Sequence, residues 1–239
     1  MEIKPQKPDV SVEDISIVLV GAFNPSIYHP MWFALQGLIR ETEAEAAKIE
    51  IIHPDVASFS IEWLTVQVLR DRFTASIKAE VYHKHLNDFA QGVFLKLAHT
   101  PIWQMGFNFT SRIHFKSEED WHAFGHFIAP KSPWAGVLSS PGMRGFQMQS
   151  LRPSGGNPEK PGCIVLSVEA DLLNCGDALV RINDHYEVPV SSEGERSKGG
   201  ASWAVELLKD DFFESLKYAR VTTQNLVDKF LSSRTVDAG

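Results

Sequence analysis

Hydrophobic and polar residues alternate along the stretch IWQMGFNFTSRIHF, residues 102–115. Successive side chains of a β-strand point to opposite faces of a sheet, whereas the pattern of a helix repeats about every 3.6 residues. The alternation therefore predicts one long strand with a buried face and an open face. The apolar set is Trp103, Met105, Phe107, Phe109, Ile113 and Phe115. The polar set is Gln104, Asn108, Thr110, Arg112 and His114.

Other stretches with short apolar runs or alternation predict further strands. They lie at 15–23, 60–69, 72–79, 146–152, 163–171 and 178–186. The second and third of these are separated by Arg70 and Asp71, which is the spacing of a hairpin.

Apolar residues at three- and four-residue steps predict helices after Pro30, at 81–98, after Ser117 and from 202 to about 232. Proline suits the first turn of a helix, where its missing N–H is not needed. Ser117 is followed by acidic residues, as is typical of an N-cap. The last helix is too long for a single core contact to support, so we allow for a break in it.

The predicted elements follow one another as β-α-β-β-α and then as β-α-β-β-β-α. This order predicts an α+β fold of two layers, with a curved antiparallel sheet carrying helices on one face. It is compatible with two fused β-α-β-β-α-like halves. We expect a flexible N-terminal segment at 1–14, a first half at 15–101 and a second half at 102–239. The halves would share one core and form a single compact unit.

Composition and charge exclude several classes of protein. The chain has 239 residues, of which 44% are hydrophobic and 22% charged, and these are ordinary globular values. The net charge of -7 disfavours nucleic acid as the main partner. No uncharged apolar run approaches the roughly 18 residues of a membrane span, and the polar N-terminus does not resemble a signal peptide. We therefore expect a cytoplasmic protein without a membrane partner. Cys163 and Cys175 lack the spacing of a zinc site, and a disulfide scaffold is not indicated.

His122 and His126 are the most direct candidates for metal binding. Residues four apart lie on one helix face and can chelate a metal together, with His114 or His185 as a third ligand. The zincin pattern is incomplete, because Ala123 stands where a catalytic glutamate would be. The two histidines also lie to the side of the predicted apolar stripe, which favours an ordinary surface position.

Two further motifs have weaker claims to chemistry. The stretch GERSKGGAS places Arg196, Lys198, Gly199 and Gly200 before a helix, where free N–H groups attract anions. It does not satisfy the P-loop pattern, so a surface loop is the favoured interpretation. In NDHYE, residues 183–187, neighbouring Asp184 and His185 point to opposite faces of a strand and so do not form a simple acid/base pair.

The polar faces of the strands, taken together, form the remaining candidate site. They are rich in amides, arginines and histidines, whereas a solvated sheet face usually carries more lysine, glutamate and threonine. Such a face is suited to recognition. The residues expected to bind a ligand or partner are Gln104, Asn108, Arg112, His114, Arg181, Asn183 and His185.

Four segments carry a resemblance to known sequences: GAFNPSIYHPMWF (21–33), HTPIWQMGFN (99–108), WHAFGHFIAPKSPW (121–134) and INDHYE (182–187). Together they resemble a sporadically distributed family of bacterial conserved hypothetical proteins, over most of the chain. The resemblance implies a bacterial, cytoplasmic protein and is compatible with a defence-related or mobile locus. It assigns no catalytic residue.

In the absence of a recognisable catalytic arrangement, the sequence favours a non-enzymatic binding or assembly protein. The polar face of the sheet would engage a protein partner or a second copy in a homo-oligomer. The alternative is a small-molecule sensor or enzyme with a pocket lined by Arg112, His114, Arg181 and His185. A second alternative is a protein that binds zinc or a similar metal through His122 and His126. No other cofactor is predicted.

Overall fold

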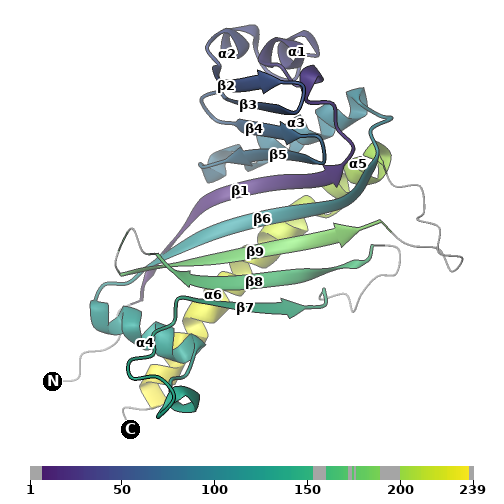
Figure 1. Cartoon of the computed structure of the whole chain (residues 1–239). Helices are drawn as coiled ribbons and strands as arrows, with labels where there is room; N and C mark the ends of the chain where they lie inside the picture. The colour runs from purple at the N-terminus through teal and green to yellow at the C-terminus, as the bar shows by residue number, and fades with distance from the viewer. Residues whose placement is uncertain (1–6, 153–159, 172–173, 175, 189–199, 237–239) are drawn as a thin grey trace, which may run out of the picture.

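The computed structural model of the chain describes residues 7–152, 160–171, 174, 176–188 and 200–236. Its strands in the first half are β1 (Asp9–Gly21), β2 (Lys48–His53), β3 (Val56–Ser60), β4 (Thr65–Leu69) and β5 (Arg72–Ile77). Those in the second half are β6 (Ile102–His114), β7 (Gly145–Ser150), β8 (Gly162–Ala170) and β9 (Asp177–Glu187). All nine form one curved, open antiparallel sheet in the order β2-β3-β4-β5-β1-β6-β9-β8-β7 (Figure 1).

The long strands β1 and β6 pair with each other at the centre of the sheet. On one face their side chains are buried, for example Ile17 opposite Phe107, and on the other face most are half-buried. The burial predicted for 102–115 is confirmed for Met105, Phe107, Phe109, Ile113 and Phe115. It is wrong for Trp103, which is half-buried near the end of β6.

The helices lie on one face of the sheet, so the predicted α+β fold is confirmed. They are α1 (Pro30–Leu35), α2 (Glu41–Glu45), α3 (His83–Lys96), α4 (Glu118–Ile128), α5 (Ala201–Asp210) and α6 (Phe212–Val236). In Figure 1, α3, α5 and α6 pass behind the sheet, with α3 on β5 and α6 on β6 and β9. None of the helices in the described ranges has both the length and the hydropathy needed to span a membrane.

Aromatic side chains fill the space between the sheet and the helices. The Phe107 ring centroid on β6 lies 5.3 Å from that of Phe212 on α6 and 5.5 Å from that of Tyr186 on β9. Phe33 of α1 makes similar contacts with Phe59 of β3 and with α3. Burial of one such side chain contributes about 1.5–3 kcal/mol, so this layer fixes which face of the central strands is inward.

The strand order repeats between the two halves. Each half begins with a central strand, β1 or β6. The chain then crosses to the edge of the sheet and returns strand by strand, until β5 pairs with β1 and β9 pairs with β6. The first half has one strand more than the second. This topology fits the predicted fusion of two related halves.

Several predicted boundaries need correction. β1 begins at Asp9, so residues 9–14 belong to a strand and not to a flexible segment. The helix after Pro30 ends at Leu35, because Gly37 adopts a positive φ of 70°. A second short helix and the strand β2 occupy 41–53, and β3 also went unpredicted.

Two predicted helix features are confirmed. The hydroxyl of Ser117 accepts a hydrogen bond from the N–H of Asp120, as an N-cap does. The C-terminal helix is broken at Asp211, where α5 ends and α6 begins.

Gly162 provides a test of the β8–β9 pairing. It has a φ of 149°, and a Cβ atom added there would lie 1.9 Å from the carbonyl oxygen of His185. We expect Gly162→Ala to lower the free energy of unfolding by more than about 3 kcal/mol, because backbone must move. Gly176 has a φ of 101° with open space around it, so Gly176→Ala should cost about 1–2 kcal/mol. Urea unfolding measures both, and equal losses would contradict the pairing.

Candidate functional site

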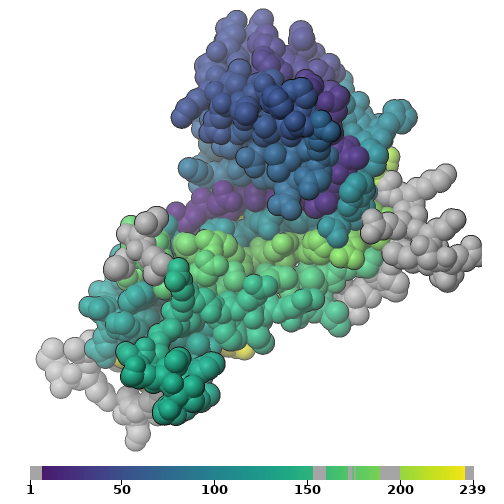
Figure 2. All heavy atoms as spheres, in the orientation of Figure 1, coloured from purple at the N-terminus to yellow at the C-terminus, as the bar shows by residue number. Residues whose placement is uncertain are grey.

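The face of the sheet opposite the helices carries the polar side chains expected from the sequence. Residues directly opposite each other in neighbouring strands point to the same face. Gln104, Asn108 and Arg112 of β6 therefore share a face with their partners on β1 and β9. In Figure 2 the purple residues of β1 and the light-green residues of β9 both reach the surface, and no helix lies in front of these strands. We call this surface the open face.

Two amide side chains lie side by side in the middle of the open face. Asn108 lies directly opposite Asn183, and both are half-buried. Gly106 beside them leaves room for the Asn183 amide, since a Cβ atom added there would lie 3.0 Å from Asn183 Oδ1. This oxygen is buried and accepts no hydrogen bond from the described residues. Burial raises the pKa of the Asp14 carboxyl, opposite Thr110, while the charges of Lys78 and Arg181 lower it.

Arg112 and His114 lie at one end of the open face, bound to buried carboxylates. The Arg112 guanidinium donates to Asp171 and, over 3.0 Å, to Asp177. Nδ1 of His114 lies 2.6 Å from the other carboxylate oxygen of Asp177. The hydrogen bonds to Asp171 and then Asp177 raise the pKa of Arg112. The Arg112 guanidinium thus neutralises buried negative charge, and the His114 ring is held by the same Asp177 carboxylate.

Arg181 and His185 are also paired. Arg181 binds Glu169 on β8, and Nε2 of His185 lies 3.3 Å from Glu187. The register spreads the four cationic candidates along the sheet. His185 lies opposite Gly106, eight residues from His114 along β6, which corresponds to about 27 Å. The structure therefore does not bring Arg112, His114, Arg181 and His185 together around one small-molecule pocket.

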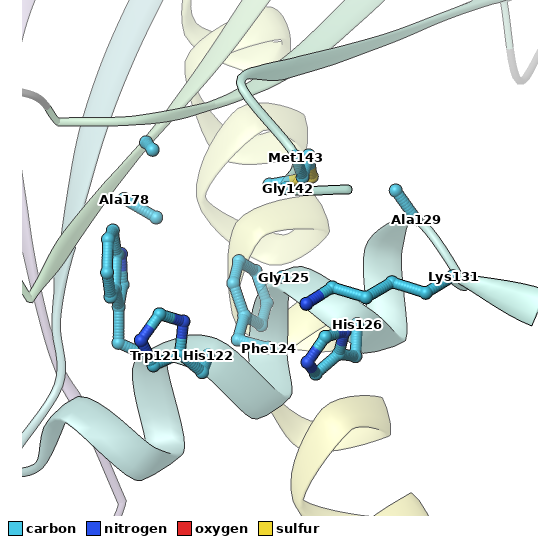
Figure 3. A pocket seen from close by; sticks show the side chains of 11 residues that line it. Trp121, His122, Phe124, Gly125, His126, Ala129, Lys131, Gly142, Met143 and Ala178 are labelled. Atoms are coloured by element: carbon cyan, nitrogen blue, oxygen red, sulfur yellow. The ribbon is translucent and has the colours of Figure 1, made fainter. Parts of the chain in front are cut away.

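His122 and His126 share one face of α4, as predicted, and line a cavity of about 140 Å³ (Figure 3). Burial lowers the pKa of His126, and the positive charges of Lys131 and His122 lower it further. Nε2 of His122 lies 3.4 Å from Glu118. Among the described residues, no group of three or more His, Cys, Asp or Glu is placed to hold a metal. The pair alone offers two ligands, fewer than a zinc site uses.

The predicted anion site lies mostly outside the described residues, because Arg196, Lys198 and Gly199 fall there. Gly200 is described and is the N-cap residue of α5, with a φ of 139°. The N–H group of Ala201, the first residue of this helix, already donates a hydrogen bond to the carbonyl of Thr100. It is therefore not available to bind an anion.

A buried polar cluster on the helix side was not predicted as a site. The Asp184 carboxylate accepts hydrogen bonds from Arg152 Nε, over 2.6 Å, from Tyr186 and from Ser215 of α6. The Arg152 guanidinium also stacks on the Tyr186 ring, 3.2 Å from its centroid. Burial and then the Asp184 charge raise the pKa of Tyr186. The cluster lies at the base of a cavity of about 410 Å³ between β8, β9 and α6.

A signal for this cluster is present in the sequence. Asp184 occupies the inward phase of β9, which otherwise holds apolar residues such as Val180 and Ile182. A carboxylate at such an inward position requires buried hydrogen-bond donors. The sequence alone does not show which residues supply them. Asp184 and His185 do lie on opposite faces, as predicted. Because each donor of the cluster is bound to Asp184, we interpret the cluster as a structural link that joins β9 to α6 and to Arg152, in the segment that follows β7.

The sequence was compared with protein-family models and with curated proteins, and neither comparison found a match.

Arg112 and Arg181, both on the open face, are expected to differ in their effect on stability. Arg112→Ala leaves Asp171 and Asp177 without their main cation, and both side chains are less than 10% exposed. We expect a loss of about 3 kcal/mol in the free energy of unfolding. Arg181 and Glu169 are each more than 40% exposed, so Arg181→Ala should cost less than about 1 kcal/mol. Urea unfolding of both variants at neutral pH makes the comparison, and a larger loss for Arg181→Ala would contradict this assignment.

Proposed function

We propose that the chain is a non-enzymatic binding or assembly protein that engages a protein partner through the open face. The observation that carries this proposal is the pair of amides on that face, which no helix of the described residues covers. Asn108 and Asn183 lie there side by side across β6 and β9, with Gly106 and Gln104 next along β6. Amides can both donate and accept hydrogen bonds, so they can pair with backbone or side chains of a partner.

The distribution of charge on the open face supports recognition by neutral contacts. Arg112, His114, Arg181 and His185 each have a carboxylate within hydrogen-bonding or ion-pairing distance. The centres of protein interfaces are depleted of charged side chains, while polar rims are tolerated. In this proposal the amide pair forms the centre of the interface and the ion pairs form its rim.

The buried oxygen of Asn183 adds a second line of support. A buried polar atom without a hydrogen bond is unfavourable by about 1–3 kcal/mol. Rotation of the Asn183 side chain toward a donor of a partner would remove this penalty. Binding would then be favoured by a hydrogen bond that the described residues do not supply.

The resemblance of the four segments supports a proposed origin. It favours a bacterial, cytoplasmic protein in a defence-related or mobile-element context, and it brings no activity with it. A partner would then be encoded in the same bacterium.

Partner capture with matched variants tests the proposal. The purified chain is immobilised and exposed to soluble extract of its source bacterium. The variants are Asn108→Arg on the open face and Asn225→Arg on the exposed side of α6. A protein captured by the wild type should bind the Asn108→Arg variant at least tenfold more weakly and the Asn225→Arg variant equally well. A tenfold change corresponds to about 1.4 kcal/mol.

Circular dichroism and thermal melting show whether each variant is folded. If no protein is captured, or if both folded variants bind the captured protein as the wild type does, the open face is not the binding surface.

A further inference from the structure

The sheet has two edges, and they differ in chemistry. One edge is β2, with the sequence KIEIIH, and the other is β7, with the sequence GFQMQS. Each is paired on one side only among the described residues. An edge strand presents backbone N–H and C=O groups that can pair with another strand. Proteins usually block such edges with charges, prolines or bulges.

β2 has these blocking features. It carries Lys48, Glu50 and His53, and its register with β3 shifts between Ile49 and Ile51. Glu50 is also held by a hydrogen bond from Ser58 of β3, over 2.7 Å. The edge formed by β2 is therefore protected from pairing.

β7 has none of these blocking features. Its six residues are uncharged, contain no proline and pair with β8 without a register shift. Its neighbours Arg144 and Arg152 flank the strand, and Arg152 is neutralised by Asp184. The edge formed by β7 is open to another strand.

Met148 lies in the middle of this strand with its side chain on the helix side. It is opposite Leu166, which is in turn opposite the buried Ile182. α6 packs on β6 and β9, which lie further from this edge of the sheet. Met148 is 58% exposed. This apolar side chain would be buried if another strand paired with the edge beside it.

We propose that two copies of this chain pair through β7 in an antiparallel manner, with Met148 of each copy at the two-fold axis. Opposed residues in antiparallel strands point to the same face, and a two-fold axis perpendicular to the sheet preserves that face. The residue at the axis therefore lies opposite itself. The sheet continues from one copy into the other.

The sequence of β7 favours a second copy over an unrelated peptide. The stretch Gln147-Met148-Gln149 reads the same in both directions. With Met148 at the axis, Gln147 of each copy lies opposite Gln149 of the other. The interface therefore contains two pairs of facing glutamine amides. The two Met148 side chains cover each other on the helix side. This self-complementarity is what an isologous interface requires.

Charge also favours this strand as the contact between copies. Two chains that each carry a net charge of -7 repel each other, and their contact is least unfavourable at an uncharged surface. The pairing does not depend on the proposed partner of the open face. It would place the open faces of both copies on the same side of one continuous sheet.

The mass of the protein in solution tests the pairing. Light scattering coupled to size exclusion should give twice the chain mass for the wild type. Met148→Lys places two like charges against each other and should give the mass of one chain. Ile51→Lys makes the same kind of change on β2, at a residue that is 44% exposed, and should stay dimeric. A monomeric wild type, a dimeric Met148→Lys variant or a monomeric Ile51→Lys variant each overturns the proposal.

Disulfide trapping tests the register. In a background with Cys163→Ser and Cys175→Ser, Met148→Cys should form a disulfide-linked dimer on mild oxidation. The two Cα atoms at the axis would be about 4.5–5.5 Å apart, within disulfide range. Ser150→Cys in the same background should not, because its two copies would be about 13 Å apart. Equal trapping of both variants, or trapping of Ser150→Cys alone, rejects the register.

Discussion

The pairing of β1 with β6 is the interaction on which the rest of the structure depends. These strands come from different halves of the chain, and their ladder joins the halves into one sheet. Because side chains alternate with a period of two, a slip of one residue would move Phe107 and Ile17 from the core to the surface. The aromatic layer beneath α6 makes such a slip unfavourable. The same register fixes which residues form the open face, because the residues that alternate with the inward apolar ones must point outward.

That constraint explains how one strand serves both stability and recognition. The inward residues of β6 pack against α6, while Asn108 and Gln104 remain available on the other face. The cationic residues on the open face have a different role from the amides. Arg112 neutralises Asp171 and Asp177, and so it belongs to the scaffold more than to a ligand site. On the helix side, Asp184 has a comparable structural role, because it joins β9 to α6 and to Arg152 after β7.

The sequence predicted those parts of the fold that follow from local periodicity. The alternation in β6, the helical spacing in α3 and the N-cap at Ser117 are each set by a few neighbouring residues. β2 could not be found in this way, because all six of its residues are exposed and no buried phase exists to detect. The partners of Arg112 lie 59 and 65 residues away in the chain, so only the fold brings them together. For the same reason the sequence placed Arg112 and His185 in one site, although the register separates them.

The central claim is that β6 divides a buried core from an accessible face that binds a partner. It is tested most directly by the rates of thiol modification at two neighbouring positions. In a background without native cysteines, Thr110→Cys lies on the open face and Ser111→Cys lies in the core, where serine is 6% exposed. We expect position 110 to react at least tenfold faster than position 111, and a bound partner to slow only position 110. Equal rates at the two positions, or a partner that leaves position 110 unaffected, would contradict it.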